Sequence, residues 1–227
     1  MLWGGSRGFR HSIGFGSPRS CKLTYQPISI RNAVQFAWPA FKKHWGLFTE
    51  IFLTVFGAWA ALEVVVISGQ RFGLVLWTLA HITFLYFFAG IEVGLLRICL
   101  DVAEGKEPAY RDAFRHLAIG PQFLAGQLLY VLMVLAGLVV LIVPGVLLGG
   151  RYAMFGFYMA DGEPNLIRSF NRSAALSIGK RLSLFGILVA LFLFNLLGAC
   201  FLGVGLFVTL PVSVLATASI YRQLTAP

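Results

Sequence analysis

The stretch LSLFGILVALFLFNLLGACFLGVGLFVTLPVSVLATASIY, Leu182 to Tyr221, contains 40 residues and no charged side chain. A second uncharged stretch, Leu117 to Gly150, contains 34 residues. About 20 apolar residues are enough to cross the hydrocarbon core of a bilayer once. Each stretch therefore predicts two crossings, and they must be helical because lipid offers the backbone no hydrogen-bond partners.

The composition and the charge distribution also indicate a membrane protein. The chain is 58% hydrophobic and 12% charged, whereas soluble domains are about 45–50% apolar and about 25% charged. The net charge of +9 does not predict nucleic-acid binding, because the basic residues lie beside apolar segments, as in proteins oriented in a bilayer. The expected partner is the lipid bilayer itself, including anionic lipid.

The apolar segments predict an all-α fold, a polytopic membrane bundle of about six transmembrane helices with cytoplasmic amphipathic helices. It forms a single integral-membrane domain over residues 28–227, and residues 1–27 are a mobile tail or one that orders on a partner. The fourth crossing is short, which leaves a complete or a partial crossing open. The predicted crossings are about 45–68, 72–96, 118–143, 146–160, 182–202 and 206–221.

Proline residues predict where helices break. Pro144-Gly145 separates the third and fourth crossings, Pro211 interrupts the sixth, and Pro39 kinks an amphipathic helix from Ser29 to His44. Short turns are expected at 69–71 and 203–205, between paired crossings.

A second amphipathic helix follows the fourth crossing, with Leu166, Ile167, Phe170 and Ala174 facing inward and Gly179 as its stop. Both amphipathic helices suit the headgroup layer. The basic residues expected to face lipid or a partner there are Lys42, Lys43, Arg168, Arg172, Lys180 and Arg181.

The loop charges predict the orientation of the chain. With the N terminus inside, 16 of the 18 Lys and Arg residues are cytoplasmic, and only Arg71 and Arg151 are not. We therefore expect a multi-pass protein of the cell (inner) membrane with cytoplasmic N and C termini.

Ionisable residues within the crossings are candidate functional residues. Glu63 and Arg151 both lie roughly 8–11 Å below the outer surface by helical rise, which predicts a contact between them. His81, near the middle of the second crossing, is either a hydrogen-bonded structural residue or an axial ligand of a haem or chlorophyll-type ring. Glu50 and Glu92 are either solvated at the interface, paired with Lys43 or Arg97, or part of a proton or cation path.

Two glycine motifs, Gly90-x-x-x-Gly94 and Gly145-x-x-x-Gly149, predict close approach of helices. The chain contains no Walker sequence, no His-Glu-x-x-His and no Gly-x-Ser-x-Gly motif. We therefore expect neither catalytic activity nor a cofactor.

Several short motifs resemble those of a widespread bacterial and archaeal family of six-helix integral-membrane proteins. The similar segments span about Ser29 to Leu224 and are residues 33–38, 103–108, 112–114, 144–145 with Arg151, 173–179, 205–211 and 221–222. The family includes uncharacterised stand-alone proteins and the membrane domain fused to some glycerophosphodiester phosphodiesterases. The resemblance implies a six-helix membrane domain without catalytic residues, since the family's known catalysis belongs to a separate soluble domain.

These observations favour a non-catalytic membrane scaffold, anchor or accessory subunit that binds other subunits of a membrane complex. A small transporter or channel-like protein is the first alternative, because broken helices at Pro144-Gly145 and Pro211 can line substrate sites. A pigment- or haem-binding subunit that uses His81 is the second.

Overall fold

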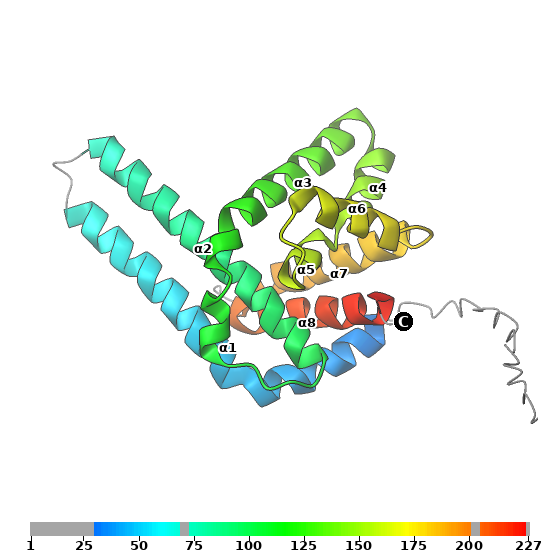
Figure 1. Ribbon diagram of the computed structural model, residues 1–227, viewed down its shortest axis with the longest axis horizontal. Coiled ribbons are helices and arrows are strands. Elements are labelled where there is room, and N and C mark those ends of the chain that lie inside the picture. Colours follow the sequence, from blue (N-terminus) through cyan, green and yellow to red (C-terminus); the bar gives the residue numbers. More distant parts are fainter. Residues whose placement is uncertain (1–29, 69–72, 201–204, 226–227) are drawn as a thin grey trace, which may run out of the picture.

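The computed structural model describes residues 30–68, 73–200 and 205–225, and helix is the only regular secondary structure in those ranges (Figure 1). The predicted tail at 1–27, the turn at 69–71 and most of the turn at 203–205 lie outside the described residues. The helices are α1 (Ile30–Ser68), α2 (Gly73–Ala103), η2 (Tyr110–Phe114), η3 (Leu117–Ile119), α3 (Gly120–Val140), α4 (Ile142–Tyr152), α5 (Phe155–Ala160), α6 (Leu166–Leu176), α7 (Arg181–Cys200) and α8 (Leu206–Thr225).

Four segments of the described chain, not six, are long and apolar enough to cross a membrane. They are Arg31–Ile67, Gly73–Ala103, Tyr110–Val140 and Arg181–Cys200. The fourth predicted crossing is wrong as a single helix, because α4 has 11 residues and α5 has six. At 1.5 Å per residue α4 is about 16 Å long, roughly half of the hydrocarbon thickness.

The predicted sixth crossing is helical in α8, but α8 is not among those four apolar segments. Its polar side chains Thr209, Ser213, Thr217 and Ser219 are buried in the protein. Ser213 accepts a hydrogen bond from Asn195 of α7, and the hydroxyls of Thr217 and Ser219 donate to carbonyl oxygens of α8 itself. A helix that other helices cover can carry such residues, because they do not meet lipid.

The helix break after α3 lies at Leu141 and not at the predicted Pro144-Gly145. Leu141 is extended, with φ −161° and ψ 142°, and Pro144 stands in the first turn of α4. In a continuous helix the ring of Pro144 would clash with the carbonyl of Val140, four residues earlier, whereas proline is tolerated in a first turn. Pro144 therefore ends the preceding helix a few residues before its own position, and it is tolerated in the first turn of the next helix.

The two other prolines do not break their helices. Pro211 lies inside α8, and Pro39 lies inside α1. The non-helical backbone of α1 is at His44, with φ −110° and ψ 18°. At this position Lys43 forms an ion pair with Glu107, and Nδ1 of His44 lies 3.8 Å from Oε2 of the same carboxylate.

The core of the molecule surrounds α8, which lies across its centre against α1, α2 and α7 (Figure 1). Leu215, Ala216, Ala218, Ile220 and Tyr221 of α8 are all buried. The start of α1 and the end of α8 lie at the same end of the molecule, and the chain between them forms two hairpins, α1–α2 and α3–α4, that diverge from each other.

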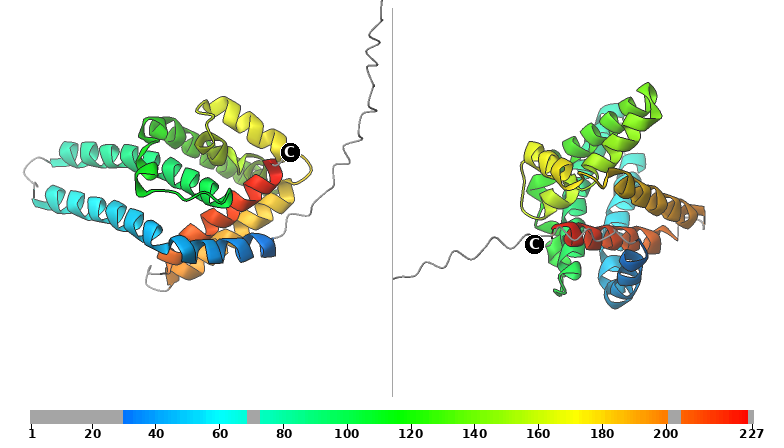
Figure 2. Two further views of the ribbon diagram at one scale, coloured as in Figure 1. Left: turned by 60° about the horizontal axis from the view of Figure 1, so that its bottom comes forward. Right: turned by 90° about the vertical axis from the view of Figure 1, so that its right-hand side faces the viewer.

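The far half of the α1–α2 hairpin projects beyond the other helices (Figure 2). We call residues 53–67 of α1 and 74–88 of α2 the distal arm. Only 6% of the residues in the most apolar window of α1 are buried, and only 11% in that of α2. The protein itself thus covers little of this apolar surface.

The near half of α2 is packed closely by contrast. A Cβ atom on Gly94 would lie 2.0 Å from the carbonyl oxygen of Ala113, and one on Gly90 would lie 2.7 Å from Cα of Leu117. In the α3–α4 hairpin, Gly145 fits against Leu138, and Gly149 fits against the ring of Phe185. These four glycines allow backbones and side chains to approach where no methyl group would fit.

The predicted amphipathic helix after the fourth crossing corresponds to α6. Asn165 caps it by accepting a hydrogen bond from the backbone N–H of Arg168, and Gly179 follows its end with φ +76°. Phe170 and Ala174 are buried, but Ile167 is 72% exposed, so its predicted inward position is wrong. The buried face of α6 instead includes Ser169 and Ser173.

Candidate functional site

Helix α2 carries polar side chains at three levels, and each level contacts a different helix. His81 lies in the distal arm, Glu92 follows after a rise of about 16 Å, and Arg97 lies about 8 Å further on. Their partners are Glu63 in α1, Gln127 in α3, and Asp161 at the end of α5.

At the first level His81 and Glu63 form a pair. Nε2 of His81 lies 3.1 Å from Oε1 of Glu63, and Nδ1 lies 2.8 Å from the carbonyl oxygen of Trp77, whose ring stacks on the imidazole. A carbonyl can only accept, so Nδ1 carries a proton that it donates to Trp77. Because both ring nitrogens are engaged, binding of a haem or pigment metal by His81 would require loss of the contact with Glu63.

The predicted partner of Glu63 is corrected by this geometry. Glu63 pairs with His81 and not with Arg151, whose guanidinium lies 5.4 Å from the ring centroid of Tyr152. Helical rise placed the two charges at equal depth, but α1 and α4 belong to hairpins that diverge (Figure 1). Nε of Arg151 is buried without a hydrogen-bond partner among the described residues.

At the second level Glu92 accepts one hydrogen bond, from Nε2 of Gln127 at 3.0 Å. Neither of the expected basic partners, Lys43 or Arg97, pairs with it, since both bind other carboxylates. Within the part of the chain that the structure describes, no cation lies within ion-pair distance of Glu92. This carboxylate is therefore held by a neutral amide alone.

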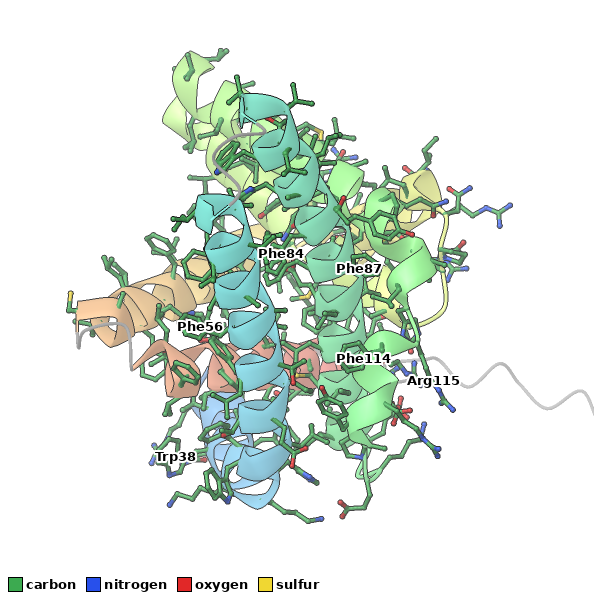
Figure 3. The ribbon with its side chains drawn as sticks, turned by 90° about the vertical axis from the view of Figure 1, so that its left-hand side faces the viewer. Trp38, Phe56, Phe84, Phe87, Phe114 and Arg115 are labelled. Carbon is green, nitrogen blue, oxygen red and sulfur yellow. The ribbon has the colours of Figure 1, made fainter. Side chains whose placement is uncertain are left out.

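Glu92 lines a groove of about 450 Å³ between α1, α2 and α8. Two aromatic pairs contribute to its walls: Phe56 and Trp59 of α1, with ring centroids 5.8 Å apart, and Phe84 and Phe88 of α2, at 6.1 Å. In Figure 3 Phe84 lies between the two helices, whereas Phe87 and Phe114 lie on the side of α2 that faces η2. The groove is thus aromatic with one carboxylate.

At the third level Asp161 joins three helices. Its carboxylate accepts hydrogen bonds from Arg97 at 2.9 Å, from both terminal nitrogens of Arg222 at 2.9 and 3.0 Å, and from the Tyr221 hydroxyl at 3.2 Å. Arg97 also pairs with Asp101 at 3.0 Å. We call these residues, together with Glu104 and Lys106, the ionic cluster.

Glu104 and Lys106 extend the ionic cluster toward solvent. Glu104 pairs with Lys106 and, at 2.5 Å, with Arg222. The hydrogen bond from Lys106 lowers the pKa of the Glu104 carboxyl, and the same contact raises the pKa of Lys106. Both residues therefore keep their charges at neutral pH.

The six basic residues predicted to face lipid or a partner have different surroundings. Lys42 is exposed, with its ammonium 5.0 Å from the ring centroid of Trp38, whereas Lys43 pairs with Glu107. Arg172 and Arg168 lie 3.1 and 3.9 Å from Glu163. Lys180 is half-buried, and Nε of Arg181 is buried without a hydrogen-bond partner in the described chain.

Asp161 is the residue that sequence reasoning missed. Its partners Arg97 and Arg222 are 64 and 61 positions away in the chain, so no local pattern reveals the contact. The sequence did contain one signal for such a contact. Arg97 and Arg222 both stand near the ends of apolar helices, where an arginine is expected to have a fixed partner.

The described ranges contain no group of three or more His, Cys, Asp or Glu side chains that could hold a metal ion. The four long apolar helices suggest an α-helical membrane protein. Comparisons with protein-family models, with curated proteins and with solved structures give no match to this chain. The resemblance to the six-helix family thus stays a prediction.

Proposed function

We propose that the protein is a non-catalytic scaffold or accessory subunit of a membrane complex, and that its distal arm contacts a partner subunit. The exposure of the distal arm carries this proposal. Its two helices project beyond the others (Figure 2), and most of its large apolar side chains are exposed. A projecting pair of helices offers more surface to a neighbour than a closed bundle does. Large apolar surfaces of this kind mark interaction with lipid or with protein.

In the proposed topology both termini are cytoplasmic and the membrane is the cell (inner) membrane. The placement of the start of α1 and the end of α8 at one end of the molecule supports this arrangement. The helices α4 and α5 together bring the chain back after α3, and α8 is a last crossing that other helices screen from lipid. Basic residues near the termini favour the cytoplasmic face and anionic lipid.

Photo-crosslinking in native membranes tests the proposal. A benzoylphenylalanine is placed at Leu85 in the distal arm, which is 45% exposed, and for comparison at Leu197 in α7, which is 63% exposed. We expect a discrete protein adduct from position 85 and lipid adducts alone from position 197. The same partner should co-purify in stoichiometric amount from gentle detergent. Lipid adducts alone from both positions would contradict the proposal.

A small transporter is the second candidate, and the interrupted chain from α3 to α5 favours it. The extended Leu141 interrupts the helix between α3 and α4, and such breaks line the substrate sites of many transporters. Solute uptake into proteoliposomes that contain the protein alone would support this candidate over the scaffold. A visible absorption spectrum of the same purified sample tests the pigment alternative at His81, for which a colourless protein is the contradicting result.

A further inference from the structure

We propose that the groove between α1, α2 and α8 binds a lipophilic organic cation, with the Glu92 carboxylate as its counter-ion. The groove walls include Phe56, Trp59, Phe84 and Phe88 of the distal arm, but this inference does not depend on the scaffold function, because its test uses the purified protein without any partner. It rests on three observations: the Glu92 carboxyl group without a cationic partner among the described residues, the aromatic walls and the volume of the groove.

The first step concerns the charge. A carboxylate within an apolar helix is costly and as a rule pairs with a cation or marks a functional site. Among the described residues Glu92 receives only the hydrogen bond from Gln127, and the neighbouring Arg97 is bound by Asp101 and Asp161. The site therefore has a carboxyl group for which the described chain provides no cation.

The second step concerns the walls. The rings of Trp59 and Phe56 from α1, and of Phe84 and Phe88 from α2, line the same groove as Glu92. The faces of aromatic rings attract cations, tryptophan most strongly, and the attraction grows when water is excluded. A neutral acyl chain would gain nothing from the carboxylate, whereas an organic cation interacts favourably with both the carboxylate and the rings.

The third step concerns size. The volume of about 450 Å³ lies in the range of small-molecule sites, roughly 300–1,000 Å³, in which apolar and aromatic walls surround a few polar groups. A helix about 10 Å in diameter from a partner subunit does not fit such a space. The second groove, about 650 Å³ on the other side of α2, has apolar walls with two threonines and no charge.

Binding of tetraphenylphosphonium tests the proposal, because its charge is fixed and its phenyl groups match an aromatic site. Radiolabelled probe is titrated onto the purified full-length protein in detergent by scintillation proximity. We expect saturable binding that neutral triphenylphosphine oxide does not displace. Absence of saturable binding, or displacement by this neutral compound, would overturn the proposal and leave an apolar groove for lipid or for part of a partner.

Two variants locate the site. Glu92→Gln removes the charge but keeps an oxygen that can accept from Gln127, and we expect affinity for the probe to fall at least tenfold. Glu63→Gln is the matched control, because Glu63 is another carboxylate of α1 and α2 that does not line the groove, and affinity should be unchanged. Unaltered binding to Glu92→Gln would refute the assignment. If that variant does not fold, Trp59→Leu decides, with a several-fold loss expected and no loss as the refuting result.

Discussion

The two halves of helix α2 are stabilised in different ways. Its near half is packed through Gly90 and Gly94 against η2 and η3 and ends in the ionic cluster. Its far half, in the distal arm, contacts α1 through the pair of Glu63 and His81 and leaves most of its apolar side chains exposed. The near half of α2 is therefore covered by other helices of the same chain, whereas the apolar surface of its far half is left for lipid or a partner to cover.

This difference shows that hydropathy does not report burial in such a chain. The arm and the near half are both apolar, but only the near half has glycines at close backbone contacts and ends in a cluster of ion pairs, whereas the arm has the single pair of Glu63 and His81. In lipid, close packing and interhelical hydrogen bonds hold helices together, since the tails are as apolar as the side chains. Substitutions should accordingly have large effects in the near half and small effects in the arm.

The largest effect is expected for Gly94→Ala, because the new Cβ would lie 2.0 Å from the carbonyl oxygen of Ala113. We expect a loss of about 3 kcal/mol or more in stability, or no folded protein. The matched control is Gly57→Ala in the arm, where a Cβ meets no atom within 4 Å and helix propensity predicts a gain of about 0.5–1 kcal/mol. Unfolding in nanodiscs, followed by circular dichroism, measures both. Equal losses of stability in the two variants would show that the near half of α2 and the distal arm are packed equally closely.

The next largest effect is expected for Asp161→Asn, which leaves Arg97 and Arg222 without their shared anion. We expect a loss of about 2–3 kcal/mol, less than for a fully buried pair because all three side chains are about a quarter exposed. Glu107→Gln, which removes the exposed partner of Lys43, is the control and should lower the melting temperature much less. A loss no larger than that of the control would mean that the ionic cluster does not hold α2, α5 and α8 together.

A smaller effect is expected in the distal arm itself. A double-mutant cycle with Glu63→Ala and His81→Ala should give a favourable coupling between the two residues, weaker than the loss at Asp161. A parallel cycle with Glu63→Ala and Arg151→Ala should give none, because Arg151 contacts Tyr152 in another hairpin. Coupling in the second cycle and not in the first would contradict the pair of Glu63 and His81 and would support the contact between Glu63 and Arg151 that depth in the membrane predicted.

The smallest effect is a pH dependence at the ionic cluster. Because the pKa of Glu104 is lowered in the folded protein, its contribution to stability is complete above the ordinary carboxyl pKa of about 4.3 and is lost as pH falls through the lower, folded value. The melting temperature should therefore decrease below about pH 4. Glu104→Gln should make this decrease shallower. If the melting temperature of that variant depends on pH as it does in the unaltered protein, Glu104 makes no such contribution to stability.

The length of the apolar segments predicted the helical class and the positions of α1, α2, α3 and α7, because the bilayer imposes length and helicity directly. This criterion failed at α4 and α5. Pro144 ends the preceding helix at Val140, and two short helices follow in place of one long crossing. It could not predict Asp161 or the partner of Glu63. Those contacts depend on which hairpins lie side by side, and depth in the membrane carries no information about that.

The pair in the distal arm has a consequence for how the chain enters the membrane. Glu63 and His81 stand on either side of the short connection between α1 and α2, and together they need only one shared proton to be neutral. A hairpin in which they already touch brings this pair into the apolar phase without net charge, whereas either helix alone brings one of the two groups without its partner. Insertion of α1 and α2 as one unit is thereby favoured over insertion one after the other.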